Sequence, residues 1–94
     1  MSMNAMLDEA TDYVCKRSMR ARAARKQSRW IVQLALRHLN AGASTDDVGR
    51  LVRADVKAAN PMFAMILIQI LLPIIIRLII EWWLNRDKTE HGWP

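Results

Sequence analysis

Four side chains interrupt an apolar stretch of this 94-residue chain at intervals of four residues: Gln69, Pro73, Arg77 and Glu81. This spacing places them on one side of a helix. Arg77 and Glu81 are i, i+4 neighbours, so their charges can pair. A polar side on an apolar helix is typical of membrane helices that line a pore or bind a partner helix. The alternative is structural: a proline kink, an arginine that reaches the membrane surface, and a tolerated glutamine.

A block of basic residues in the N-terminal half is a candidate for binding anionic partners. Residues 16–29 hold seven Lys or Arg side chains and no acid: Lys16, Arg17, Arg20, Arg22, Arg25, Lys26 and Arg29. Such a block can lie on anionic lipid, where each basic residue contributes about 1 kcal/mol, or can bind the phosphates of nucleic acid. No aromatic residue interleaves with the block, so base stacking is not supported. We therefore expect lipid rather than nucleic acid. A solvated helix face is the structural alternative.

The other chemistry-bearing residues form no catalytic or metal-binding pattern. His38 and His91 have no Cys or carboxylate neighbour at metal-ligand spacing. The chain offers no glycine-rich phosphate loop and no clear Ser/His/Asp set. Its one cysteine, Cys15, allows no intramolecular disulfide. We therefore expect no catalytic residue, no cofactor, no metal ion and no enzymatic activity.

The element that positions the four polar side chains is long enough to cross a bilayer. Residues 62–76 carry no charge. As a helix, residues 62–84 would reach roughly 34 Å, against about 30 Å for a bilayer core. Asn60 and Pro61 suit the N-cap and the first position of this helix. Trp82 and Trp83 lie where interfacial aromatic anchors are expected.

The composition of this element favours insertion into a membrane. Thirteen of residues 63–80 are Ile, Leu or Phe, and together they contribute about −6 kcal/mol on the insertion scale. Arg77 opposes insertion by at most about 3 kcal/mol, and by less near a helix end where it can reach the surface. The alternative is a helix buried in a soluble oligomer, but no charged stripe precedes Arg77. We predict one transmembrane helix over about 61–84.

Two further helices are predicted upstream. Apolar residues at three- and four-residue spacings indicate a helix over about 3–39, although the basic block leaves no clean apolar stripe in its middle. The run 40–42, Asn-Ala-Gly, predicts its end, because Asn or Gly readily takes the left-handed conformation. Ser44 and Asp47 have capping-box spacing and begin an amphipathic helix over about 46–59.

The positive charge lies on one side of the apolar element. Residues 1–61 hold eleven Lys/Arg against six Asp/Glu, whereas residues 77–94 hold three of each. This imbalance predicts that the N-terminus lies inside and the C-terminus outside. The N-terminal stretch lacks the features of a cleavable signal peptide, so the apolar element itself would direct insertion.

The sequence therefore predicts an all-α, single-pass membrane protein. Its segments are a basic helical membrane-proximal region (1–60), a transmembrane helix (61–84) and a short polar tail (85–94). This layout resembles small membrane proteins of phages and bacteria in general. We expect a structural or interaction subunit, or an anchor, whose partners are anionic lipid head groups and either another protein or further copies of itself. The alternatives are a homo-oligomeric, holin-like pore and a virion or nucleoid protein that links nucleic acid to a membrane.

Overall fold

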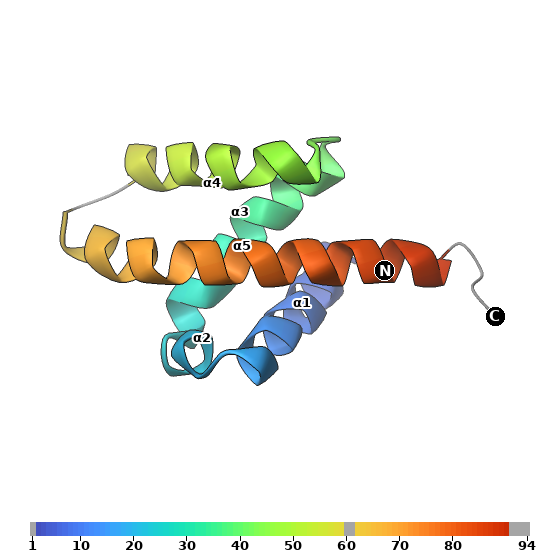
Figure 1. Cartoon of the computed structure of the whole chain (residues 1–94), viewed down its shortest axis with the longest axis horizontal. Helices are drawn as coiled ribbons and strands as arrows, with labels where there is room; N and C mark the ends of the chain where they lie inside the picture. The colour runs from blue at the N-terminus through green and yellow to red at the C-terminus, as the bar shows by residue number, and fades with distance from the viewer. Residues whose placement is uncertain (1, 60–61, 91–94) are drawn as a thin grey trace.

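The apolar C-terminal element forms one long helix that packs against all the others (Figure 1). In this computed structural model, the structure describes residues 2–59 and 62–90. They form α1 (Met3–Arg17), α2 (Met19–Ala23), α3 (Arg25–Asn40), α4 (Thr45–Ala59) and α5 (Met62–Glu90). No strand occurs within these residues, which confirms the predicted all-α fold.

The region expected to be one helix over about 3–39 is divided into three. Ser18 has extended backbone angles (φ −138°, ψ 116°) and ends α1. Its hydroxyl then accepts a 3.2 Å hydrogen bond from the amide of Ala21, which caps the start of α2. A second break at Ala24 begins α3. Because the basic block offers no apolar stripe, a straight helix would have left the apolar faces on either side of it apart; the two breaks bring them together.

The resulting hairpin of α1 and α3 buries most of the apolar residues of both helices. Ala10 and Val14 of α1, and Ile31 and Val32 of α3, have no exposed surface. Two ion pairs join the helices outside this core: Arg25 with Asp12, at 2.6 Å, and Arg29 with Asp8. The hairpin therefore uses part of the basic block for its own packing.

The turn into α4 follows the predicted pattern. α3 ends at Asn40, and Gly42 has a φ of 100°, a conformation that glycine adopts without strain. The hydroxyl of Ser44 accepts a 3.2 Å hydrogen bond from the amide of Asp47, as an N-cap does. α4 then runs back beside α5 (Figure 1).

α5 is 29 residues long and continues through Pro73 without a break. It extends to Glu90, so residues 85–90, expected to belong to a polar tail, are helical. The predicted N-cap at Asn60 and Pro61 lies outside the described residues, as does His91. The chain has a radius of gyration of 13.0 Å, close to the ~13 Å of a folded domain of about 100 residues. The helices upstream of residue 60 and the apolar helix thus pack as one unit.

Candidate functional site

The predicted polar side of α5 lies on the outer surface of the bundle. Gln69, Pro73, Arg77 and Glu81 are all exposed. The same side carries exposed apolar residues, of which Ile66 is the most accessible at 68%. Proline removes one backbone donor from a helix, and Pro73 lies on this exposed side. The four side chains therefore share one face, as their spacing predicted.

The opposite side of α5 forms the core of the bundle. Its buried residues recur at three- and four-residue spacings: Ile68, Leu71, Leu72, Ile75, Leu78, Ile79 and Trp82. All four of the other helices pack against α5. Sequence reasoning missed this side, because in a helix that is almost wholly apolar the buried face has no distinguishing composition. The position of Gln69, Arg77 and Glu81 was the available signal, since a core forms opposite polar residues.

Glu81 is bound by a residue from the other end of the chain. The phenol of Tyr13 in α1 donates a 2.9 Å hydrogen bond to its carboxylate. No ion pair joins Arg77 to Glu81 within the part of the chain that the structure describes, so the expected i, i+4 pair is not formed. Burial and the hydrogen bond to Glu81 raise the pKa of Tyr13 above its usual 10.0, while Arg17 opposes this.

The two tryptophans expected as interfacial anchors differ in exposure. Trp82 is 5% exposed and belongs to the core, whereas Trp83 is partly buried against it. The guanidinium of Arg86 lies 5.7 Å from the Trp82 ring and 5.8 Å from the Trp83 ring. In this packed state, Trp82 is therefore withdrawn from the surface.

The basic block separates into residues with and without internal partners. Arg25 and Arg29 pair with acids of α1, and the bond to Asp12 raises the pKa of Arg25. Arg17 stacks on Tyr13, with its guanidinium carbon 3.6 Å from the ring centroid. Arg22 donates to the carbonyl of Cys15 at 3.3 Å. These contacts stabilise the hairpin and its corner.

The remaining three cations of the block are directed to solvent. Lys16, Arg20 and Lys26 are exposed, and none forms an ion pair among the described residues. They come from the end of α1, from α2 and from the start of α3, which meet at one corner of the bundle (Figure 1). This cationic corner is the part of the block available to an anionic partner.

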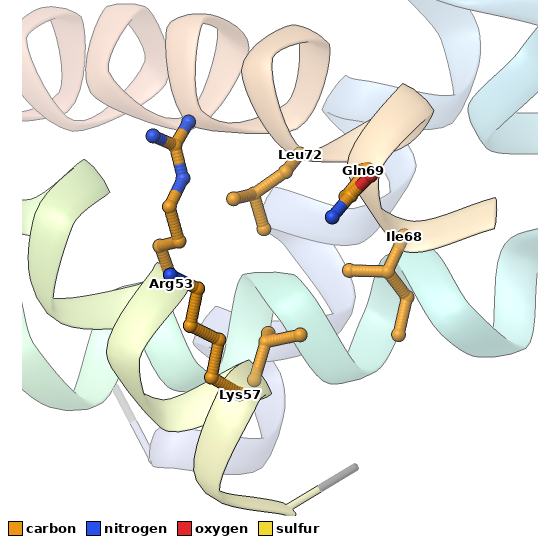
Figure 2. A pocket seen from close by; sticks show the side chains of 6 residues that line it. Arg53, Lys57, Ile68, Gln69 and Leu72 are labelled. Carbon is orange, nitrogen blue, oxygen red and sulfur yellow. The ribbon is translucent and has the colours of Figure 1, made fainter. Parts of the chain in front are cut away.

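A groove lies between α4 and α5 (Figure 2). Its first part, of about 320 Å³, is lined by Arg53, Val56, Lys57, Ile68, Gln69 and Leu72. An adjoining part, of about 340 Å³, shares Arg53 and Leu72 and adds Gly49, Pro73, Ile76, Arg77 and Ile80. The sequence analysis predicted an amphipathic helix over about 46–59 but assigned no binding role to Arg53 or Lys57. Their i, i+4 spacing, next to the apolar Val56, was the sequence signal that two cations border one side of the groove.

The histidine expected to stand alone has a carboxylate partner. Nε2 of His38 in α3 lies 2.5 Å from Oδ2 of Asp55 in α4. This contact joins two helices that also pack through apolar residues. The described residues include no group of three or more His, Cys, Asp or Glu side chains placed to hold a metal ion. The pair is therefore best understood as a structural contact.

One segment of α5 meets the length and composition of a membrane span. It is Ile68–Arg86, 19 residues long, and 39% of the window that defines it is buried inside the bundle. The core helix of a soluble protein meets the same measure. Comparison with family models, with curated proteins and with solved structures found no match to this chain.

Proposed function

We propose that the protein is a small membrane anchor or interaction subunit that binds anionic lipid through its cationic corner and inserts α5 as a single span. In the inserted state the N-terminus lies inside and the C-terminus outside. The observation that carries the proposal is the pairing of two features in one bundle. A helix of membrane-spanning length and composition, Ile68–Arg86, packs beside a corner of unpaired cations, Lys16, Arg20 and Lys26.

Insertion on this proposal requires α5 to leave the bundle. α1 and α3 carry charged residues such as Asp8, Asp12 and Arg29 on their outer surfaces, and charges at the centre of a bilayer are strongly disfavoured. The bundle therefore cannot enter the hydrocarbon as a unit. α1 contacts α3, and α3 contacts α4, so these helices can close on one another when α5 departs.

Both the packed state and the inserted state remove apolar surface of α5 from water. Its inner residues are buried in the bundle, but its outer apolar residues, Ile66, Ile70 and Leu84, are between 47% and 68% exposed. A bilayer would bury both sides at once, which favours insertion by roughly 25 cal/mol for each Å² of apolar surface removed from water. Attraction of the cationic corner to lipid head groups adds to this near an anionic surface.

The test is carbonate extraction of membranes that contain the full chain, combined with protease access to both termini. We expect the chain to stay in the membrane pellet. In sealed right-side-out vesicles, the N-terminus should be protected from protease and the C-terminus should be cleavable. Quantitative release by carbonate would overturn the span. A Lys16→Gln, Arg20→Gln, Lys26→Gln variant should bind vesicles of anionic lipid more weakly than the unchanged chain, while its binding to neutral vesicles should not change.

A second candidate function, a homo-oligomeric pore, is favoured by the shared face of Gln69, Pro73, Arg77 and Glu81. In an inserted oligomer this face would line the space between copies. Dye release from vesicles tests it: replacing Gln69 and Arg77 with leucine should abolish release and leave carbonate-resistant anchoring intact. Absence of release by the unchanged chain would dismiss the pore and leave the anchor standing.

A further inference from the structure

The groove between α4 and α5 combines an apolar floor with a cationic edge. Val56, Ile68 and Leu72 form the floor and are only 2–4% exposed. Arg53 and Lys57 extend from α4 over the same space into which Gln69 of α5 projects (Figure 2). The groove therefore offers hydrocarbon contact below and hydrogen-bond donors above.

The groove has no compensating negative charge among the described residues that line it. Three acids of these two helices have other partners. Asp47 pairs with Arg50, Asp55 contacts His38, and Glu81 accepts from Tyr13. Three cations, Arg53, Lys57 and Arg77, thus surround an apolar surface without a carboxylate.

We propose that this groove binds one anionic phospholipid, with an acyl chain along the floor and the phosphate between Arg53 and Lys57. Charge complementarity identifies the occupant, since guanidinium and ammonium groups bind phosphate through charge-assisted hydrogen bonds. Each part of the groove has a volume near the lower end of the roughly 300–1,000 Å³ typical of ligand sites. The continuation past Leu72 to Ile76 and Ile80 gives an extended chain room to follow α5.

This inference rests on the proposed function, because binding to an anionic membrane is what brings the packed bundle into contact with such a lipid. The acyl chain would occupy the interface that must open for α5 to leave α4. Lipid in the groove would therefore couple arrival at an anionic membrane to release of the helix, whereas the cationic corner acts only through general attraction to the surface.

The experiment is titration calorimetry of the full chain with dihexanoyl phosphatidylglycerol, kept below its micelle concentration, and with the neutral phosphatidylcholine of the same chain length. We expect saturable binding of one anionic lipid and at least about tenfold weaker binding of the neutral one. The double variant Arg53→Gln, Lys57→Gln should weaken anionic binding by about tenfold or more. The control, Arg37→Gln, Arg50→Gln, removes the same charge from exposed positions outside the groove and should stay within about twofold.

Each other result contradicts a defined part of the proposal. Equal weakening in both double variants would mean general electrostatics and would overturn the groove, as would equal affinity for the two lipids. Displacement of the lipid by an equal concentration of inorganic phosphate would show a free-anion site instead. Binding to phosphatidylglycerol vesicles without binding of the monomeric lipid would overturn the groove and leave the proposed function standing. Binding of the monomer without binding of vesicles would do the reverse.

A second measurement needs no substitution and so does not depend on the folding of a variant. Phosphatidylglycerol with a photoreactive diazirine near the end of its acyl chain is mixed with the unchanged chain, irradiated, and the labelled peptides are identified by mass spectrometry. We expect labels on apolar residues that line the groove, such as Val56, Leu72 and Ile76. Labels confined to the outer residues Ile66, Ile70 and Leu84 would overturn the proposal.

Discussion

The phenol of Tyr13 in α1 donates a hydrogen bond of 2.9 Å to the carboxylate of Glu81 in α5, across 68 positions of sequence. This bond fastens the C-terminal part of the apolar helix to the N-terminal hairpin. It also gives Glu81 a partner outside its own helix. In the packed state, one member of the polar side of α5 therefore has a structural role.

The first prediction concerns the strength of this bond. Tyr13→Phe should lower the free energy of unfolding by about 0.5–1 kcal/mol, because a partly exposed hydrogen bond contributes at the low end of the usual range. Urea denaturation measures the change. Glu81→Ala removes the acceptor, and the double variant completes a cycle with Tyr13→Phe. Strictly additive effects of the two changes would contradict a direct bond.

The second prediction is a loss of stability in alkali that depends on Tyr13. Its pKa is raised in the folded protein, first by burial and then by the bond to Glu81. The folded state therefore holds the phenolic proton more tightly than the unfolded state does. This contribution is complete below the usual pKa of 10.0 and disappears as pH rises through the folded pKa.

The measurement is the thermal midpoint of unfolding at a pH below and a pH above the usual pKa of Tyr13. Alkali affects the whole protein, so the comparison that matters is with Tyr13→Phe. The decrease in midpoint should be smaller in that variant than in the unchanged chain. Identical decreases in the two proteins would contradict the prediction.

The third prediction uses the two glycines that the structure describes in full. A Cβ added to Gly49 in α4 would lie 3.5 Å from a methyl carbon of Ile76, an ordinary contact. Gly49→Ala should therefore raise the free energy of unfolding by about 0.5–1 kcal/mol, the usual difference between alanine and glycine inside a helix. Gly42→Ala is the contrasting change, since its φ of 100° disfavours a side chain, and it should destabilise. Destabilisation by Gly49→Ala would show that α4 and α5 approach more closely than this contact implies.

Part of the fold follows from local sequence signals. Ser44 and Asp47 mark the start of α4, and Gly42 marks the end of α3, because caps and positive φ angles depend on a few adjacent residues. The spacing of Gln69, Pro73, Arg77 and Glu81 likewise identified one face of α5. These are short-range relationships, which a single sequence contains.

The division of the first helix depends on contacts between residues far apart. Ser18 can begin a helix or continue one, and its extended conformation is decided by the packing of α1 on α3. The ion pair of Arg25 with Asp12 exists only once that hairpin has formed. Local composition indicated a basic surface, whereas tertiary structure determines which of those cations remain available. The groove has the same origin, since α4 and α5 must pack before Arg53 meets Leu72.

The fourth prediction compares two isoleucines of α5 that make the same contribution to its hydrophobicity. Ile75 is fully buried in the bundle, whereas Ile70 is 47% exposed on the outer side. Ile75→Ala should lower the free energy of unfolding of the packed bundle by about 2–5 kcal/mol, because it leaves a cavity in the hydrophobic core. Ile70→Ala should lower it by less than about 1 kcal/mol. Both changes remove the same side-chain atoms from the apolar helix.

The pair therefore separates the stability of the bundle from the affinity of α5 for lipid. If the packed state competes with insertion, Ile75→Ala weakens the packed state far more than the inserted one. Its carbonate-resistant fraction at limiting anionic lipid should then exceed that of Ile70→Ala, although the two helices are equally apolar. Equal fractions, with the expected difference in urea denaturation, would mean that α5 does not have to leave the bundle to bind the membrane. The protein would then act from the membrane surface, with α5 still packed against α1, α3 and α4.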